Sequence, residues 1–385
     1  MKMDDFLVLF IINVALVALC GFIYIILPGI TRKAFLFGVK IPGEQAEHPE
    51  VLDIRKRYIR AVFLATLLIA AICIIQYLVW PGATLIFTLY FPVLLVPMFF
   101  LAFVPAWRAA GELKEREGWA VSSMAFADTK TAAARGSLGM VPWIWYILGL
   151  MVVIASIIVT IIRFPYLGDY IITHWDLAGN PTSYREATWW AVMMLPLVNL
   201  GMLLTMVLAA ISIVKAKLQI DPANPQLSFA QHQVYRRRMG GAIGFLTLVM
   251  IAFIALTGLA IVFPYWEMFP VLVGGTIAIH LPIIALIVVQ IRTGQGGCKV
   301  KIDPAELEDI PENIETRKTT YGRGDDKYWK FGSFYCNPDD PAHLVEDRFG
   351  SSISFNFSRP IIKFITALFI IGLVVMYAWL TISLI

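Results

Sequence analysis

Charged residues are scarce in this chain. They make up 15% of the 385 residues, whereas hydrophobic residues make up 59%, and the mean hydropathy is +0.74. A soluble domain usually contains about 25% charged residues. The shortage argues against an ordinary soluble protein and predicts a chain that has lipid as its solvent.

Cysteine and the common catalytic motifs are also scarce. Two of the four cysteines, Cys20 and Cys73, lie in apolar runs, while Cys298 and Cys336 lie in the polar C-terminal segment, and no pair has zinc-site spacing. The chain has no phosphate-binding glycine loop, dinucleotide fingerprint, HExxH, GxSxG or nucleic-acid-binding motif. We therefore expect no disulfide framework, no metal, no cofactor and no nucleic-acid partner, and the sequence leans away from an enzyme.

Eight apolar runs are long enough to cross a bilayer, which takes about 20 residues. They span residues 6–27, 59–80, 83–106, 141–162, 188–214, 240–263, 268–291 and 361–384. The first run follows a short acidic start without a basic leader, so we expect it to stay as a helix rather than to be removed. The runs predict an all-α membrane protein with eight transmembrane helices.

Every second connection between the apolar runs carries almost no basic residues, and the chain ends belong to the same set. Of the 31 Lys and Arg residues, only Lys2, Arg163 and Arg185 fall on that set. The others gather in and beside the connections 28–58, 107–140, 215–239 and 292–360, and cytoplasmic loops are the ones that carry excess Lys and Arg. This predicts a multi-pass membrane protein with both termini and the 163–187 loop outside.

We divide the chain into a three-helix segment (1–140), a four-helix segment that carries the external loop (141–292), a small cytoplasmic α/β cap (293–359) and a final helix (360–385). Within the cap, residues 353–358 alternate apolar and polar types, which predicts a half-buried strand with Phe355 inside. We expect an aromatic cluster to form the core of the cap rather than the alternative, an exposed partner-binding surface. The cluster consists of Tyr328, Trp329, Phe331, Phe334 and Tyr335. Asp339 and Asp340, between prolines, are typical of turn residues.

The external loop is dense in polar and aromatic residues, with a turn signal at Gly179-Asn180-Pro181. It fits a self-hydrogen-bonded plug, a pocket for a peptide or lipid headgroup, or a metal or acid–base pair formed by His174 and Asp176. For the binding alternative we name a set of candidate residues. They are His174, Trp175, Asp176, Gly179, Asn180, Tyr184 and Arg185.

Ionisable residues are nearly absent from the apolar runs, although proton- or ion-coupled transporters usually keep some at mid-membrane. The exception is His280 in the seventh run, close to Pro282. It fits either a ligand or proton contact, or a neutral histidine that is hydrogen-bonded between helices.

Pro165 and the run THWDLAGNPTSY resemble the signature of a bacterial membrane-protein family that carries the domain of unknown function number 1648. The matching residues are His174, Trp175, Asp176, Gly179 and Pro181. The group includes the immunity protein against the sporulation-delay toxin, and the segment DDKYWKFGSFYCNPDDP resembles a second unnamed domain found with the first. Thr182 and Arg185-Glu186 depart from the pattern, in which Asp often follows the proline and Ser-Lys comes later.

The resemblance implies a plasma-membrane protein of the Gram-positive type, linked to toxin resistance, signalling or envelope homeostasis. Together with the residues, it predicts a non-enzymatic membrane protein that binds a peptide toxin, signal or lipid outside the cell, with a possible protein partner for the cap. A lipid or peptide transporter, with a polar path between His174 and His280, is the alternative. A metal-dependent membrane hydrolase is the second alternative.

Overall fold

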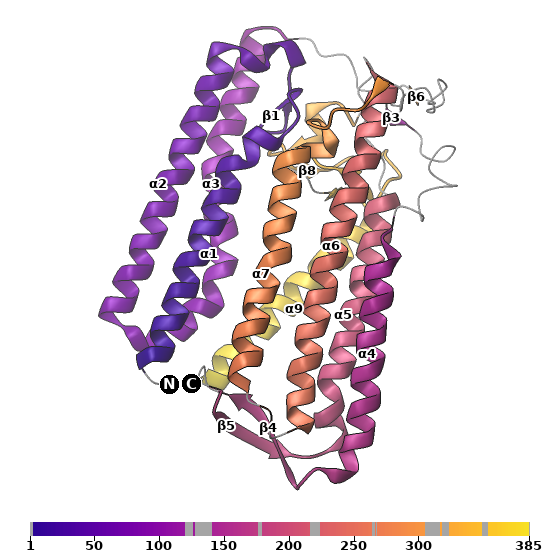
Figure 1. Ribbon diagram of the computed structural model, residues 1–385. Helices are drawn as coiled ribbons and strands as arrows, with labels where there is room; N and C mark the ends of the chain where they lie inside the picture. Colours follow the sequence, from indigo (N-terminus) through magenta and orange to yellow (C-terminus); the bar gives the residue numbers. More distant parts are fainter. Residues whose placement is uncertain are drawn as a thin grey trace. The chain divides into compact units, whose positions relative to one another are not determined.

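A computed structural model describes residues 3–119, 126–127, 141–175, 179–215, 224–263, 266, 268–304, 316–317, 323–348 and 353–384 (Figure 1). Most of these residues are helical. The long helices are α1 (Met3–Ile30), α2 (Pro49–Val79), α3 (Thr84–Arg116), α4 (Trp143–Arg163), α5 (Trp189–Lys215), α6 (Pro225–Val262), α7 (Met268–Thr293) and α9 (Pro360–Leu384). Across the described residues, seven helices meet the length and hydropathy expected of a membrane span, in agreement with a multi-pass membrane protein. The remaining long helix, α3, has 33 residues.

Several helices extend beyond their apolar runs. Helix α2 begins ten residues before its run, at Pro49, because proline suits the first helical position and the His48 ring accepts a hydrogen bond from the Glu50 amide. Helix α3 continues to Arg116 and ends where Gly118 adopts a φ of 62°. An apolar run measures the hydrocarbon-facing part of a helix, not the helix itself.

The chain forms two compact units. The first contains residues 1–129, 216–230 and 294–385, and the second contains residues 130–215 and 231–293. The first unit therefore joins α1, α2 and α3 with the cap segment and α9, and the second holds α4, α5, most of α6 and α7.

In the first unit, α1, α2 and α3 enclose a core that runs the length of the helices, from Cys73 and Phe91 to Ala110 and Leu113. The loop after α1 forms a two-residue hairpin between β1 (Phe35–Leu36) and β2 (Val39–Lys40). Its turn residues Phe37 and Gly38 have φ angles of 48° and 80°, as the tight turns of two-residue hairpins require.

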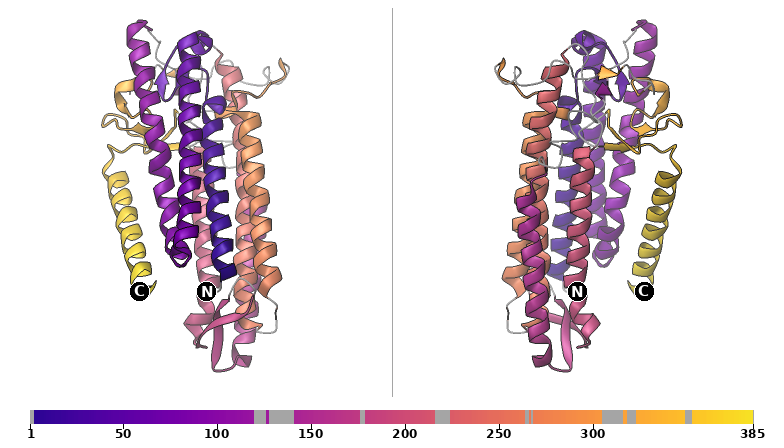
Figure 2. Two further views of the ribbon diagram at one scale, coloured as in Figure 1. Left: turned by 90° about the vertical axis from the view of Figure 1, so that its left-hand side faces the viewer. Right: turned by 90° about the vertical axis from the view of Figure 1, so that its right-hand side faces the viewer.

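The cap is built from short antiparallel pairs: β7 (Trp329–Lys330) with β8 (Phe334–Tyr335), and β9 (Leu344–Glu346) with β10 (Ile353–Phe355). A further pair joins β3 (Phe126–Ala127) to β6 (Thr316–Arg317). Single-turn 3₁₀ helices occur at Gly43–Glu47, Pro81–Ala83, Phe164–Tyr166, Gln295–Gly297 and Asp326–Tyr328. Figure 2 shows the cap strands leading directly into α9.

Charge pairs join the cap to the ends of α1 and α3. Arg32 pairs with Glu346, and Lys114 Nζ lies 2.6 Å from Asp326 Oδ2. Gly38 lies against Gly332, where a Cβ atom would come within 2.0 Å of the Gly332 carbonyl oxygen. The cap is therefore docked tightly on these helix ends.

The interior of the cap differs from the sequence prediction. Trp329 and Tyr335 are buried as expected, but Phe331 and Phe334 are exposed. In β10 the buried and exposed sides of the strand are the reverse of those expected. Ser354 is buried, whereas Phe355 is 45% exposed. The buried polar side chains are retained because neighbouring carbonyl groups bind them; the Ser354 hydroxyl, for example, donates to the Ser333 carbonyl.

Asp340 is a second departure, since it is a buried partner and not a surface turn residue. Its carboxylate pairs with Arg323, which is also buried, and accepts from the Tyr335 hydroxyl at 2.9 Å. Burial opposes its ionisation, but the hydrogen bonds from Arg323 and the Ala342 amide leave its pKa below the usual value.

In the second unit, Arg236 and the 163–187 loop lie at opposite ends of the helices. Arg236, near the start of α6, donates to the Val214 carbonyl at the end of α5. At the other end, α4 leads through a single turn into the hairpin of β4 (Tyr170–Trp175) and β5 (Pro181–Glu186).

Candidate functional site

The 163–187 loop contains a β-hairpin that stands on the ends of α4, α5 and α6. Its inner face is anchored by Ile171, which is buried with Val192 and with Ile261 and Val262 of α6. Trp175 packs against this cluster and is half-buried. Gly179 has a φ of 84°, so the predicted turn at 179–181 is present as a left-handed glycine.

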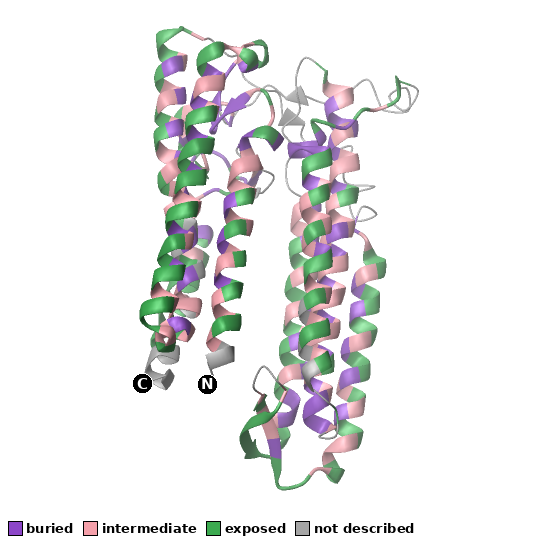
Figure 3. Ribbon diagram, turned by 60° about the vertical axis from the view of Figure 1, so that its left-hand side comes forward, coloured by how far each residue is buried: buried purple, intermediate pink, exposed green. Residues whose placement is uncertain are grey.

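The outer part of the hairpin is open to solvent (Figure 3). All six residues of β5 are exposed, including Tyr184 and Arg185. In the part of the chain that the structure describes, β5 pairs with β4 alone, so its other edge carries unpaired backbone groups. Such an edge is a template for a further extended segment.

His174 is exposed, beside a register shift in the β4–β5 ladder. Its Nδ1 atom lies 3.2 Å from the Thr173 hydroxyl, and it stands across the ladder from Ser183. Asp176, its expected companion, lies outside the described residues. No group of three potential metal ligands occurs among the residues that the structure describes.

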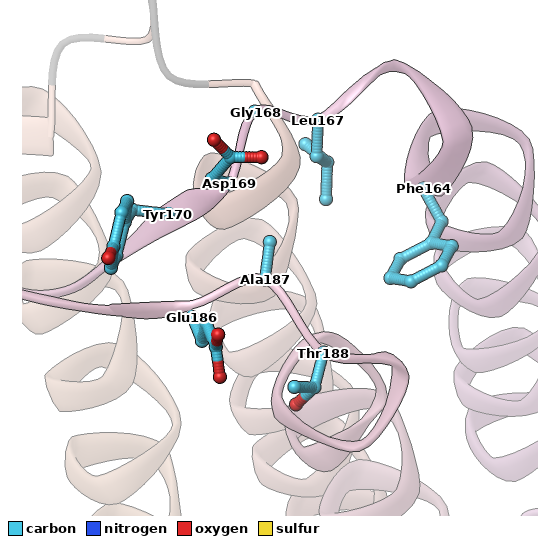
Figure 4. A pocket seen from close by; sticks show the side chains of 8 residues that line it. All are labelled: Phe164, Leu167, Gly168, Asp169, Tyr170, Glu186, Ala187 and Thr188. Carbon is cyan, nitrogen blue, oxygen red and sulfur yellow. The ribbon is translucent and has the colours of Figure 1, made fainter.

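A pocket opens at the root of the hairpin, away from its tip (Figure 4). Its volume is about 630 Å³, and its walls come from the turn after α4, the helix-proximal ends of both strands and the residues just before α5. The lining residues are Phe164, Leu167, Gly168, Asp169, Tyr170, Glu186, Ala187 and Thr188.

The predicted tip residues, including His174, Trp175 and Tyr184, do not line this pocket. None of the candidate binding residues named from the sequence lines the pocket, whose acidic residues are Asp169 and Glu186. Strand pairing brings them to the same end of the hairpin, since Tyr170 pairs with Glu186 and the Ala187 amide donates to the Asp169 carbonyl at 2.9 Å.

The two pocket carboxylates point away from each other (Figure 4). This geometry does not form a two-carboxylate clamp for a metal ion, which needs convergent oxygen ligands. It gives instead a mouth with negative charge on both sides and apolar walls from Phe164 and Leu167. Such a mouth is suited to a cationic group with an apolar neighbour.

The intramembrane polar residues mostly hold helices together. The Asn13 amide donates to the Thr88 hydroxyl at 2.9 Å, and the Asn199 amide donates to the Ile251 carbonyl at 3.0 Å. His280 lies on an exposed face of α7.

In the comparison with known proteins, one segment of the chain matches a family model. Residues 151–200 match the model described as Domain of unknown function (DUF1648). The match covers the second half of α4, the hairpin and the first half of α5, so it is centred on the candidate site. No curated protein and no solved structure matches the chain.

Proposed function

We propose that this chain is an eight-span plasma-membrane protein, with both termini outside, that binds a cationic extended peptide, a toxin or a signal, through its external hairpin. The observation that carries the proposal is the combination of a fully exposed β5 edge with a pocket at its root that displays Asp169 and Glu186. A peptide can add as a strand to the edge, while an ammonium group enters the pocket.

The orientation rests on the positive-inside pattern and on the separation of the two ends within the second unit. The exposed β5 surface favours a binding hairpin over a self-contained plug. No specific observation among the described residues favours the transporter alternative or the hydrolase alternative, whereas the exposed β5 edge favours binding.

The test is native mass spectrometry of protein gently extracted from its own membrane. We expect the wild type to retain a peptide that the double variant Asp169→Asn/Glu186→Gln loses, with His174→Ala reducing retention less because it lies at the tip. Both carboxylates are exposed, so each charge contact contributes about 1 kcal/mol or less, and loss of both should weaken binding by about tenfold.

The matched control is Glu47→Gln, which removes an exposed carboxylate whose salt bridge to Lys33 contributes little. It should leave retention unchanged. Retention that is equal in wild type and double variant, in a folded sample, would refute the proposal. A retained lipid or metal that the double variant loses would assign the site to a different ligand.

A further inference from the structure

Three phenylalanines of the cap have large exposed faces. Phe331, Phe334 and Phe355 are 44%, 42% and 45% exposed. We call them the aromatic patch. The rings are connected, because Phe357 lies 5.7 Å from Phe334 and 6.3 Å from Phe355 between ring centroids. Exposure of three aromatic rings to water in so small a cap is unfavourable, so the patch calls for a partner.

The backbone at Phe331 shows that this exposure is built into the fold. Phe331 has a φ of 51°, in the left-handed region that phenylalanine rarely adopts. Such a conformation costs about 1–3 kcal/mol and persists only where the surroundings hold it. Here the ring is held against α3, with Phe100 and Trp107 at centroid distances of 6.1 and 5.5 Å.

These contacts fix the level of the patch along α3. Phe100 lies within the apolar run and Trp107 directly follows it, about 10 Å further along the helix axis. Phe334 also contacts Phe100, at 6.0 Å. The patch therefore lies where the apolar part of α3 ends, which is the level of the membrane interface and the usual place of aromatic anchors.

The same level is set independently by α9. This helix begins at Pro360, three residues after Phe357, and presents exposed apolar side chains from its first turn, including Ile361 and Phe364. The aromatic patch is therefore continuous with the exposed apolar surfaces of α3 and α9, and a bilayer that covers those helices reaches the patch.

Basic side chains accompany the patch. Lys330, Arg359 and Lys363 form a basic triad at the cap–α9 junction, where Lys330 pairs with Phe334 in the β7–β8 ladder. The charges of Lys330 and Lys363 both act on Cys336, whose pKa is nevertheless raised by burial, so the two lysines lie in the same region. The Arg359 Nε atom is buried and has no hydrogen-bond acceptor among the described residues.

We propose that the cap binds anionic lipid of the cytoplasmic leaflet, with the aromatic patch at the interface and the basic triad on the headgroup phosphate. The charge of the triad and the membrane level of the rings favour a lipid over a protein partner. The inference rests on the membrane placement in the proposed function, and it assigns to the cap a role separate from that of the hairpin.

The test uses spin labels on single cysteines in the full chain, with the native cysteines replaced, in vesicles of phosphatidylcholine with and without phosphatidylglycerol. A label at Phe355→Cys or Phe334→Cys is expected to collide with oxygen more than with a water-soluble nickel chelate. Phe369→Cys, on the exposed face of α9, is the lipid control. Lys327→Cys is the water control. Its neighbour Asp326 pairs with Lys114, which lies two helical turns beyond Trp107 and therefore beyond the apolar part of α3.

Phosphatidylglycerol is expected to shift the labels deeper, and Lys330→Gln/Lys363→Gln should weaken its effect by about fivefold per lysine. Labels at 334 and 355 that resemble the label at 327, while the label at 369 reports lipid, would overturn the inference alone. A water-exposed label at 369 would instead overturn the membrane placement. Protection of the patch that appears only at high protein-to-lipid ratio would show a second copy, and not lipid, on this surface.

Discussion

Arg348 carries a full charge inside the cap. Its guanidinium group pairs with Asp326, donates to the Gly38 carbonyl at 3.1 Å and to the Arg323 carbonyl at 3.0 Å, and lies 4.8 Å from the centroid of the Trp329 ring. Burial lowers its pKa to about 10, against the opposing effect of Asp326. One side chain thus joins the loop after α1 to two segments of the cap.

We expect Arg348→Met to destabilise the docked cap by about 3 kcal/mol, because carbonyl acceptors and a carboxylate lose their buried donor. The measurement is thermal unfolding in detergent, followed by tryptophan fluorescence. The control is Arg57→Met, which removes an exposed arginine in an i,i+4 pair with Asp53 and should change stability by about 0.5 kcal/mol or less. Equal losses in both variants would contradict the bridging role.

Among the elements, the β1–β2 hairpin decides how the cap sits on the helices. A Cβ atom at Gly38 would meet the Gly332 carbonyl, and one at Gly332 would lie 2.5 Å from the Phe37 carbonyl oxygen. Two turns therefore stack with no room between their backbones. The hairpin was not recognisable in the sequence, because its strands have two residues each and its turn places phenylalanine where asparagine is usual.

We expect Gly38→Ala to cost about 2–4 kcal/mol, from the positive φ and the collision with the turn at Gly332. Hydrogen exchange should show faster exchange of cap amides, with the helices unchanged. Gly43→Ala is the matched control in the same loop, since a Cβ atom there meets nothing within 4 Å. Cap exchange that is unaffected by Gly38→Ala would show that the two turns are not in contact.

At the scale of the whole molecule, the number of spans sets the side on which the hairpin lies. Seven helices meet the criteria for a span across the described residues, and α3 decides whether the count is eight. With α3 crossing, the hairpin and the loop after α1 lie on opposite sides. Without it, they lie on the same side.

We expect Ser183→Cys in intact cells to react with a membrane-impermeant maleimide, while Lys33→Cys reacts only after lysis. Both native side chains are exposed, so the difference reports sidedness and not burial. The native cysteines are replaced first, and lysed cells provide the control for reactivity. Reaction of both variants from the same side would contradict eight spans.

The sequence by itself determined that this protein is a multi-pass membrane protein, its helical class and the glycine turn of the hairpin. These features follow from local composition and periodicity, which act over one helix or one turn. The DUF1648 match, at residues 151–200, falls on the loop that the sequence had singled out.

Only the tertiary structure decided which face of a cap strand is buried, that Asp340 is paired inside, and that Asp169 and Glu186 share a pocket. Burial depends on partners that are distant in the chain. Ser354 and Asn356 turn inward because carbonyl groups are placed to receive them, while Phe355 turns outward. An alternating pattern fixes two faces but not which of them meets the protein, and packing makes that choice.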